Sequence, residues 1–194
     1  LESRMTAVLK SLQEHGHLTE ELEAQVFAAA SLAELEDLYL PFRPKRRTRA
    51  SMAREKGLEP LAEAIFAQIG TDPETAAAAF VDPEKKVATV QEALAGARDI
   101  IAEWINEDVE SRSQMRRLFT EKGILSSRLA AGKETDGAKY RDYFDWSEPL
   151  KNAPSHRVLA MRRAEREDIL TLSIAPPEDQ ALNLLRSRFV KGDG

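Results

Sequence analysis

The chain has 194 residues, 42% of them hydrophobic, which is enough to bury the core of one large domain or two small ones. It contains no cysteine, which excludes disulfides, thiolate metal sites and cysteine nucleophiles and is typical of the reducing cytoplasm. The net charge of −5 argues against binding nucleic acid over the whole surface, and the longest apolar run, residues 76–81, is too short to cross a bilayer. Since the first residue is Leu1 rather than Met, we expect a piece of a longer cytoplasmic protein.

Two amphipathic helices are expected at the start of the chain. Thr19 should cap the second, which buries Leu22 and Val26, and Gly16 should end the first. Because only a short turn separates them, the two helices should form an antiparallel hairpin. The apolar residues that recur at helical spacing in the first helix are Met5, Val8, Leu9 and Leu12.

A third, shorter helix should be followed by extended chain. Ser31 and Glu34 have the spacing of a capping box, in which each residue bonds the backbone N–H of the other. The helix that they open should end before Pro41. Pro41 and Pro44 should then keep the chain extended, because proline disfavours helical geometry in the residue before it.

Proline and glycine mark the next helices. Gly57 should end a helix that resumes near Ser51, and Pro60 should begin another. Asp72-Pro73 and Asp82-Pro83 repeat one start signal, an N-cap followed by proline in the first turn. The helix that begins at Pro60 should bury Leu61, Ile65, Phe66 and Ile69.

A long helix is the clearest expected element, and Asp82-Pro83 should open it. Its apolar residues alternate three and four positions apart over about five turns, so we expect one buried face. These residues are Val87, Val90, Leu94, Ala97, Ile101 and Trp104. Another helix over residues 107–122 should carry Met115, Leu118 and Phe119 inward.

The character of the sequence changes after Gly123. A short strand is expected over residues 124–129, followed by a loop at residues 133–137. Ser155 should cap a helix, and Pro176-Pro177 should introduce the last one. The helix that Ser155 caps should bury Val158, Leu159 and Met161, the strand after it should contain Ile169, Leu170, Leu172 and Ile174, and the last helix should carry Leu182, Leu185 and Phe189.

The expected fold class is therefore mainly α, a multi-helix bundle with at most a small β element near the C-terminal third. We divide the chain into a helical region over residues 1–123 and a mixed helix and short-strand region over residues 124–194.

Basic side chains are concentrated in residues 43–56, which have a net charge of +6 and leave −11 for the rest of the chain. Arginine forks and lysine charges could follow a phosphate backbone. Alternatively, they pair with acidic residues on neighbouring helices, which we favour as the main role. The candidate nucleic-acid-binding residues are Arg43, Lys45, Arg46, Arg47, Arg49 and Arg54.

Other clusters have simpler explanations than a functional site. Single-stranded nucleic acid could stack on the aromatic group formed by Tyr140, Tyr143, Phe144 and Trp146, but a small packed cluster fits better in a chain with few aromatics. The carboxylates of Asp142, Asp145 and Glu148 could bind magnesium only if they converge on one ion. The histidines His15, His17 and His156 are too few for a metal site without cysteine, and Ser155-His156 is too close in sequence to form a nucleophile and base. We therefore expect no catalysis, metal or cofactor.

One long, irregular segment resembles a known family. Residues 35–61, LEDLYLPFRPKRRTRASMAREKGLEPL, closely resemble the signature of the N-terminal helical region of the Tex family of bacterial transcription accessory proteins. Residues 96–103, 140–144 and 154–160 match the same family in order.

The resemblance implies a helical region with a helix-turn-helix-like unit, in proteins that bind nucleic acid mainly through later domains absent from this chain. We expect a non-enzymatic scaffold or interaction region with RNA, DNA or proteins of the transcription machinery as partners. The alternative is a pure protein-protein interaction module.

Overall fold

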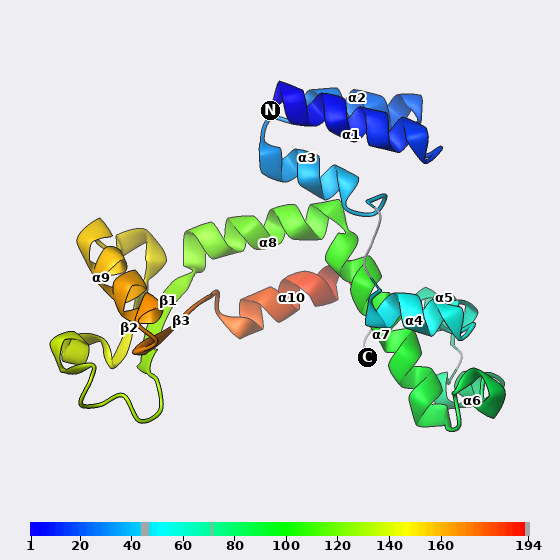
Figure 1. The fold of residues 1–194 in the computed structure, drawn as a ribbon. Helices are drawn as coiled ribbons and strands as arrows, with labels where there is room; N and C mark the ends of the chain where they lie inside the picture. The colour runs from blue at the N-terminus through cyan, green and yellow to red at the C-terminus, as the bar shows by residue number, and fades with distance from the viewer. Residues whose placement is uncertain (44–46, 71, 193–194) are drawn as a thin grey trace. The chain divides into compact units, whose positions relative to one another are not determined.

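A computed structural model describes residues 1–43, 47–70 and 72–192 (Figure 1). Its contacts form two compact units, residues 1–112 with 191–194 and residues 113–190, which are described separately below. The fold is mainly α-helical, with a three-stranded antiparallel sheet in the C-terminal third of the described chain, so the expected fold class is confirmed. The division between the units falls before Gly123, and the expected domain boundary at that glycine stays a prediction.

Three helices at the start of the chain share one core. They are α1 (Glu2–Glu14), α2 (Glu20–Ala28) and α3 (Leu32–Tyr39), and α1 and α2 lie side by side (Figure 1). Thr19 accepts a hydrogen bond from the Leu22 backbone N–H and caps α2 as expected. The buried apolar residues are Val8, Leu12, Leu22, Val26, Ala29, Leu35 and Tyr39. The expected helices and their buried faces are confirmed here.

The capping box at α3 is only half as expected. Ser31 accepts from the Glu34 backbone N–H at 3.2 Å, but the Glu34 carboxylate accepts from Ala30, the residue before the cap, at 2.8 Å. The start of α7 (Val90–Glu107) repeats this arrangement, because Thr89 accepts from the Glu92 N–H and the Glu92 carboxylate accepts from Ala88 at 2.6 Å. The two helix starts are thus stabilised by the same displaced pair of bonds.

The chain turns after α3 instead of extending. Leu40 keeps a right-handed helical conformation although Pro41 follows it. The Tyr39 carbonyl accepts from the backbone N–H groups of both Phe42 and Arg43 at 3.0 Å, which bends the chain. The helix therefore ends before Pro41 as expected, but the expectation of extended chain from Pro41 onward was wrong, and Pro44 lies outside the described residues.

A second core in the same unit forms where shorter helices pack on α7 (Figure 1). These helices are α4 (Arg49–Glu55), α5 (Glu59–Ala67) and α6 (Pro73–Ala78). Asp72 caps α6 through the Thr75 N–H, as expected. Ile69 is exposed instead of buried, because α5 ends at Ala67. The buried residues of this core are Ala50, Ala53, Leu58, Leu61, Ala62, Ala77, Val87, Ala93, Ala97 and Ile100.

The long helix begins later than expected and its buried face is rotated. Asp82-Pro83 opens only a 3₁₀ turn, η1 (Pro83–Lys85), because Asp82 and Val87 pair through their backbones and close the chain into a tight loop. Thr89 caps α7 instead. Ile100 lies in the core while Ile101 and Trp104 are only partly buried. The expected stripe correctly identified the helix but misplaced the centre of its buried face.

The second unit contains the sheet, in the order β2-β1-β3, all antiparallel. Its strands are β1 (Ile124–Leu129), β2 (Asp145–Pro149) and β3 (Leu170–Ala175). The remaining elements are α8 (Val109–Lys122), which crosses from the first unit, η2 (Ala138–Tyr143), η3 (Leu150–Asn152), α9 (Ser155–Arg166) and α10 (Glu178–Phe189). The bounds of β1 were predicted correctly, whereas β2 was not expected as a strand.

Several expectations for the helices of this unit were wrong. Ser155 is the first residue of α9, and Pro154 at the cap position offers no side-chain bond. Met161 is buried but Leu159 is exposed, because α9 faces the sheet with a different side. The side chains expected to be buried on α8 and α10 are only partly buried or exposed, namely Met115, Leu118, Phe119, Leu182, Leu185 and Phe189.

Candidate functional site

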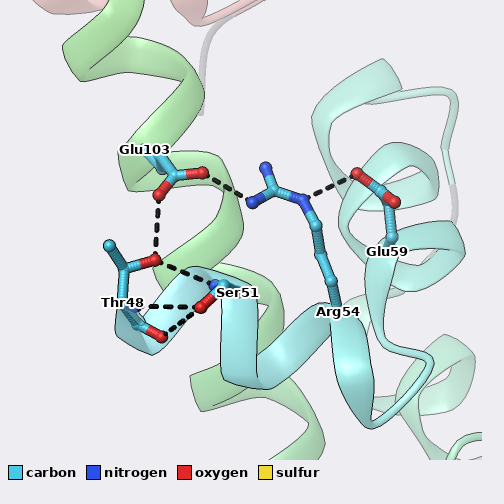
Figure 2. Close-up of polar contacts among 5 residues, drawn as sticks. All are labelled: Thr48, Ser51, Arg54, Glu59 and Glu103. Carbon is cyan, nitrogen blue, oxygen red and sulfur yellow. Dashed lines mark hydrogen bonds and ion pairs between the residues drawn. The ribbon is translucent and has the colours of Figure 1, made fainter. Parts of the chain in front are cut away.

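The basic segment of residues 43–56 is fixed at the start of α4 by a capping box (Figure 2). Thr48 accepts from the Ser51 backbone N–H at 3.0 Å, and Ser51 accepts from the Thr48 N–H at 2.9 Å. The Thr48 hydroxyl also donates to Glu103 on α7 at 3.1 Å. The start of α4 is therefore attached to α7 by this polar contact as well as by the apolar core that the two helices share.

Among the described residues of this segment, Arg54 makes the closest ionic contacts (Figure 2). Its Nη1 lies 2.5 Å from Glu103 Oε1, and its Nε lies 2.9 Å from Glu59 Oε1. The side chains of Arg54 and Glu103 are only 28% and 10% exposed. Burial by itself would lower the pKa of Arg54, but the hydrogen bonds to Glu103 and Glu59 raise it above its ordinary value. Arg54 thus joins α4, α5 and α7.

The other described arginines of the segment project into solvent. Arg47 is 72% exposed and approaches Glu55 at 3.4 Å, and Arg49 is 83% exposed and approaches Asp99 at 3.6 Å. Arg43 is exposed as well. Exposed pairs of this length contribute little to stability. Lys45 and Arg46 lie outside the described residues.

The structure thus separates the candidate residues into two groups. Arg47, Arg49 and Arg54 all lie near carboxylates of the same chain, but only Arg54 is partly buried, whereas Arg47 and Arg49 are exposed. Sequence reasoning missed the acceptors on α7. Asp99 and Glu103 are spaced four residues apart, which places both on the helix face toward α4, and this spacing was the available signal.

The aromatic residues form the packed cluster that was expected. Tyr140 is buried, and Tyr143 and Phe144 pack against the same core. Tyr143 meets Trp146 edge to face with ring centroids 6.2 Å apart, and the guanidinium of Arg157 lies 4.8 Å from the centre of the Trp146 ring. These rings are occupied by protein neighbours, which leaves them poorly placed for stacking with bases.

The acidic residues considered for magnesium do not converge. Glu148 bonds Arg157 at 2.5 Å, whereas Asp142 and Asp145 are exposed. Across the described ranges, no group of three or more His, Asp or Glu side chains is positioned to hold a metal ion.

Two of the histidines have local contacts. His15 Nδ1 lies 2.7 Å from the Ser11 carbonyl oxygen, and His17 packs against the Phe42 ring with centroids 5.5 Å apart. His156 is an exposed residue of the first turn of α9. Each of the three histidines therefore has different neighbours, and the described contacts do not bring them together.

A family model and individual relatives both relate this chain to Tex proteins. A family model described as Tex central region-like matches residues 68–191, whereas the signature in residues 35–61 had suggested the N-terminal helical region. The chain is 45% identical to Protein tex of Bordetella pertussis, covering 89% of this chain and 22% of that relative. It is 39% identical to the Transcriptional accessory protein Tex of Neisseria gonorrhoeae, covering 100% of this chain and 26% of the relative.

A more distant relative is the human S1 RNA-binding domain-containing protein 1, 24% identical over 88% of this chain and 18% of the relative. The chain thus spans about a quarter or less of the length of these curated relatives. None of the helices in the described part is both long and apolar enough to span a membrane. The extent of the family match, which runs from the end of α5 through α10, identifies the chain as a member of the Tex family.

Proposed function

We propose that this chain is a non-enzymatic helical scaffold and interaction region of a cytoplasmic, nucleic-acid-binding transcription accessory protein. The names of two relatives, a transcriptional accessory protein and an S1 RNA-binding domain-containing protein, support this proposal. Because the chain spans about a quarter or less of such relatives, most contacts with RNA or DNA and with proteins of the transcription machinery belong to other parts of the whole protein. The helix-turn-helix-like unit implied by the family is part of the same proposal.

The proposal is carried by the difference between Arg54, which is held inside the fold, and Arg47 and Arg49, which are exposed. Arg54 is partly buried and bonds both Glu103 and Glu59, so it positions the segment. Arg47 and Arg49 hold only weak, solvated partners, and exchanging such a partner for a phosphate oxygen costs little. An anchored segment with exposed guanidiniums is suited to contact a phosphate backbone.

Binding of fluorescent RNA and DNA oligonucleotides over a salt series tests this role. The double variant Arg47→Ala/Arg49→Ala should lower the slope of log affinity against log salt by about 0.7 to 0.9 for each phosphate that no longer pairs with an arginine. Arg117→Ala is the control for the loss of one positive charge, because Arg117 is as exposed as Arg47 and Arg49 and pairs with Glu121 one helical turn away. Because the control removes one arginine and the double variant removes two, a decrease of the slope in the control half as large as in the double variant would show that general charge, and not this segment, binds the oligonucleotide.

A pure protein-protein interaction module is the second candidate. Phe27 and Leu32 are large apolar side chains exposed on the helices of the first core, which favours contact with another protein. If the unaltered chain bound no oligonucleotide even at low salt, this second candidate would replace the first.

The absence of catalysis is also a proposal. It is supported by the engagement of Glu148 with Arg157, which keeps one of the three candidate carboxylates away from a shared ion. Incubation of labelled oligonucleotides with Mg²⁺ should leave them intact, and a chelator should leave the thermal midpoint unchanged. Cleavage that disappears in Asp142→Asn would contradict the proposal.

A further inference from the structure

The outer face of α9 has a row of exposed residues that lies outside the basic segment of residues 43–56. His156, Leu159, Arg163 and Arg166 are spaced three, four and three residues apart, which places them along one side of the helix. The opposite side contains the buried Met161 and Ala164. We call this row of four residues the outer face of α9.

Leu159 gives this face an apolar centre. Its side chain is 68% exposed, although it lies one turn from His156 and one turn from Arg163. A single exposed leucine is common on protein surfaces. A leucine flanked by basic residues on both sides, however, matches a ligand that has both anionic and apolar parts.

Two carboxylates that follow Arg163 closely in the sequence, Glu165 and Glu167, already have partners. Glu165 pairs with Arg162. Glu167 receives hydrogen bonds at both oxygens, from Lys139 at 2.8 Å and from the Tyr140 hydroxyl at 3.0 Å. Within the described ranges, neither Arg163 nor Arg166 makes an ion pair or a hydrogen bond through its side chain. The charge of Arg163 helps to lower the pKa of Glu167 without forming an ion pair with it, so both guanidiniums can still pair with an external anion.

The helix that presents these residues is firmly held. From its inner side, Arg157 bonds Glu148 at 2.5 Å and stacks over the Trp146 ring. Met161 and Ala164 are completely buried. Because the backbone of α9 is ordered before any ligand arrives, binding to its outer face loses little conformational entropy.

The unit that contains α9 is the more basic of the two units of the chain. Residues 113–190 contain 14 Lys or Arg and 11 Asp or Glu, a net charge of +3, although the whole chain has a net charge of −5. A positive unit attracts anions over a longer range than any one side chain. Charge complementarity therefore selects a polyanion as the occupant of this face.

We propose that the outer face of α9 is a second nucleic-acid-binding surface, separate from residues 43–56. Arg163 and Arg166 pair with consecutive backbone phosphates, and Leu159, one turn before Arg163, lies against the sugar or base next to the phosphate that Arg163 binds. This inference rests on the proposed function for the identity of the polyanion. Beyond the proposed function, it specifies where the polyanion binds, namely the outer face of α9, and which residues contact it.

A single fluorophore on the outer face tests the contact directly. The chain contains no cysteine, so Leu159→Cys can be labelled at that position alone. Phe27→Cys is the control, because Phe27 is also an exposed apolar residue on a helix but follows three acidic residues in the first turn of α2. Short RNA and DNA oligonucleotides should change the emission of the α9 label, with reversal by salt, and leave the α2 label unchanged.

Two variants then assign the contact to the arginines. Arg163→Ala/Arg166→Ala should lower the salt slope by about 1.4 to 1.8, which is the effect of two phosphate contacts. Arg162→Ala/Glu165→Ala removes a neighbouring ion pair without changing the net charge and should leave the slope as it was. Circular dichroism of each variant confirms that the helices are intact.

The outcomes separate this inference from the proposed function. If Arg47→Ala/Arg49→Ala weakens binding while the α9 variant and label have no effect, the inference is overturned and the proposed function stands. If no oligonucleotide binds the unaltered chain, both are overturned. A response of the α9 label to polyglutamate, but not to oligonucleotides, would assign the face to an acidic protein and overturn the inference.

Discussion

Arg54 on α4 and Glu103 on α7 meet at 2.5 Å although they are 49 residues apart in the sequence. The same guanidinium bonds Glu59 at 2.9 Å, so one side chain joins three helices. Glu103 also accepts from Thr48, which makes its carboxylate a shared acceptor for both ends of α4. The contact therefore determines where the exposed arginines of the basic segment lie.

We predict that Arg54→Ala lowers the free energy of unfolding by about 2 to 3 kcal/mol, because bonds to charged groups contribute about 1.5 to 3 kcal/mol each and partial exposure reduces their sum. Arg47→Ala, which removes an exposed pair, should cost less than about 1 kcal/mol. Urea denaturation of both variants measures the difference. Equal costs would mean that the contact between Arg54 and Glu103 contributes no more than a surface pair.

The register of α7 makes adjacent isoleucines unequal. Ile100 is completely buried and Ile101 only partly. Ile100→Ala should therefore cost about 2 to 5 kcal/mol, the usual range for a truncated core side chain, and Ile101→Ala should cost clearly less. The two substitutions remove the same atoms from the same helix, so each serves as the control for the other. A larger loss of unfolding free energy for Ile101→Ala than for Ile100→Ala in chemical denaturation would show that Ile101 lies in the core, as the sequence had predicted.

Gly96 permits the close approach of α7 to the helices packed on it. A Cβ at this position would lie 2.3 Å from Leu58 Cδ1 and 3.3 Å from Ala53 Cβ. Alanine favours a helix by about 1 kcal/mol over glycine, but overpacking costs about 1 to 3 kcal/mol. Since Leu58 is buried and cannot move freely, we expect Gly96→Ala to destabilise the chain in thermal unfolding.

A second substitution checks the cause. In a Leu58→Ala background the space for a methyl group exists, so Gly96→Ala should become neutral or stabilising there. A destabilisation of the same size in both backgrounds would locate the problem elsewhere than at Leu58.

Glu167 provides a prediction about pH. Hydrogen bonds from Lys139 and then from Tyr140 lower the pKa of Glu167 below its ordinary value. A carboxylate whose pKa is lowered by folding stabilises the fold above its unfolded pKa, and that stabilisation is lost as pH falls toward the folded pKa. NMR titration of the Glu167 carboxyl group should show the lowered pKa directly.

Removal of the donors identifies their contributions. Lys139→Met and Tyr140→Phe should each raise the pKa of Glu167 toward its ordinary value, with the larger change in Lys139→Met. A pKa of Glu167 that stays the same in both variants would show that these bonds do not stabilise its charged form.

Local signals in the sequence predicted the caps well. Thr19 bonds Leu22 and Asp72 bonds Thr75, and both bonds connect residues three positions apart, so a short window of sequence contains all the information they need. Asp82 also caps its turn, by accepting hydrogen bonds from the backbone N–H groups of Glu84 and Lys85, but the long helix that was expected to start there starts later. Asp82 has the same Asp-Pro signal as Asp72, but a backbone pair with Val87, outside that window, closes the chain before a helix can continue.

The candidate site could be predicted only in part. The concentration of basic residues was evident, and their pairing with acidic helices was anticipated. Which arginine is buried could not be read from the sequence, because it depends on the packing of α4 and α5 against α7 around Gly96. Leu159 shows the same limit, since its burial was inferred from apolar character and the direction in which α9 faces the sheet was unknown.

The ion pair between Asp37 on α3 and Arg112 on α8, with Nε 2.6 Å from Oδ1, has a consequence for the order in which the chain folds. The contacts of the first core lie within residues 5–42, so α1, α2 and α3 can assemble early during synthesis. Arg112 follows Asp37 by 75 residues, and closing so long a loop is entropically costlier than closing a short one. We therefore expect the contact between Asp37 and Arg112 to form late, when α8 packs against a small helical cluster that has already folded.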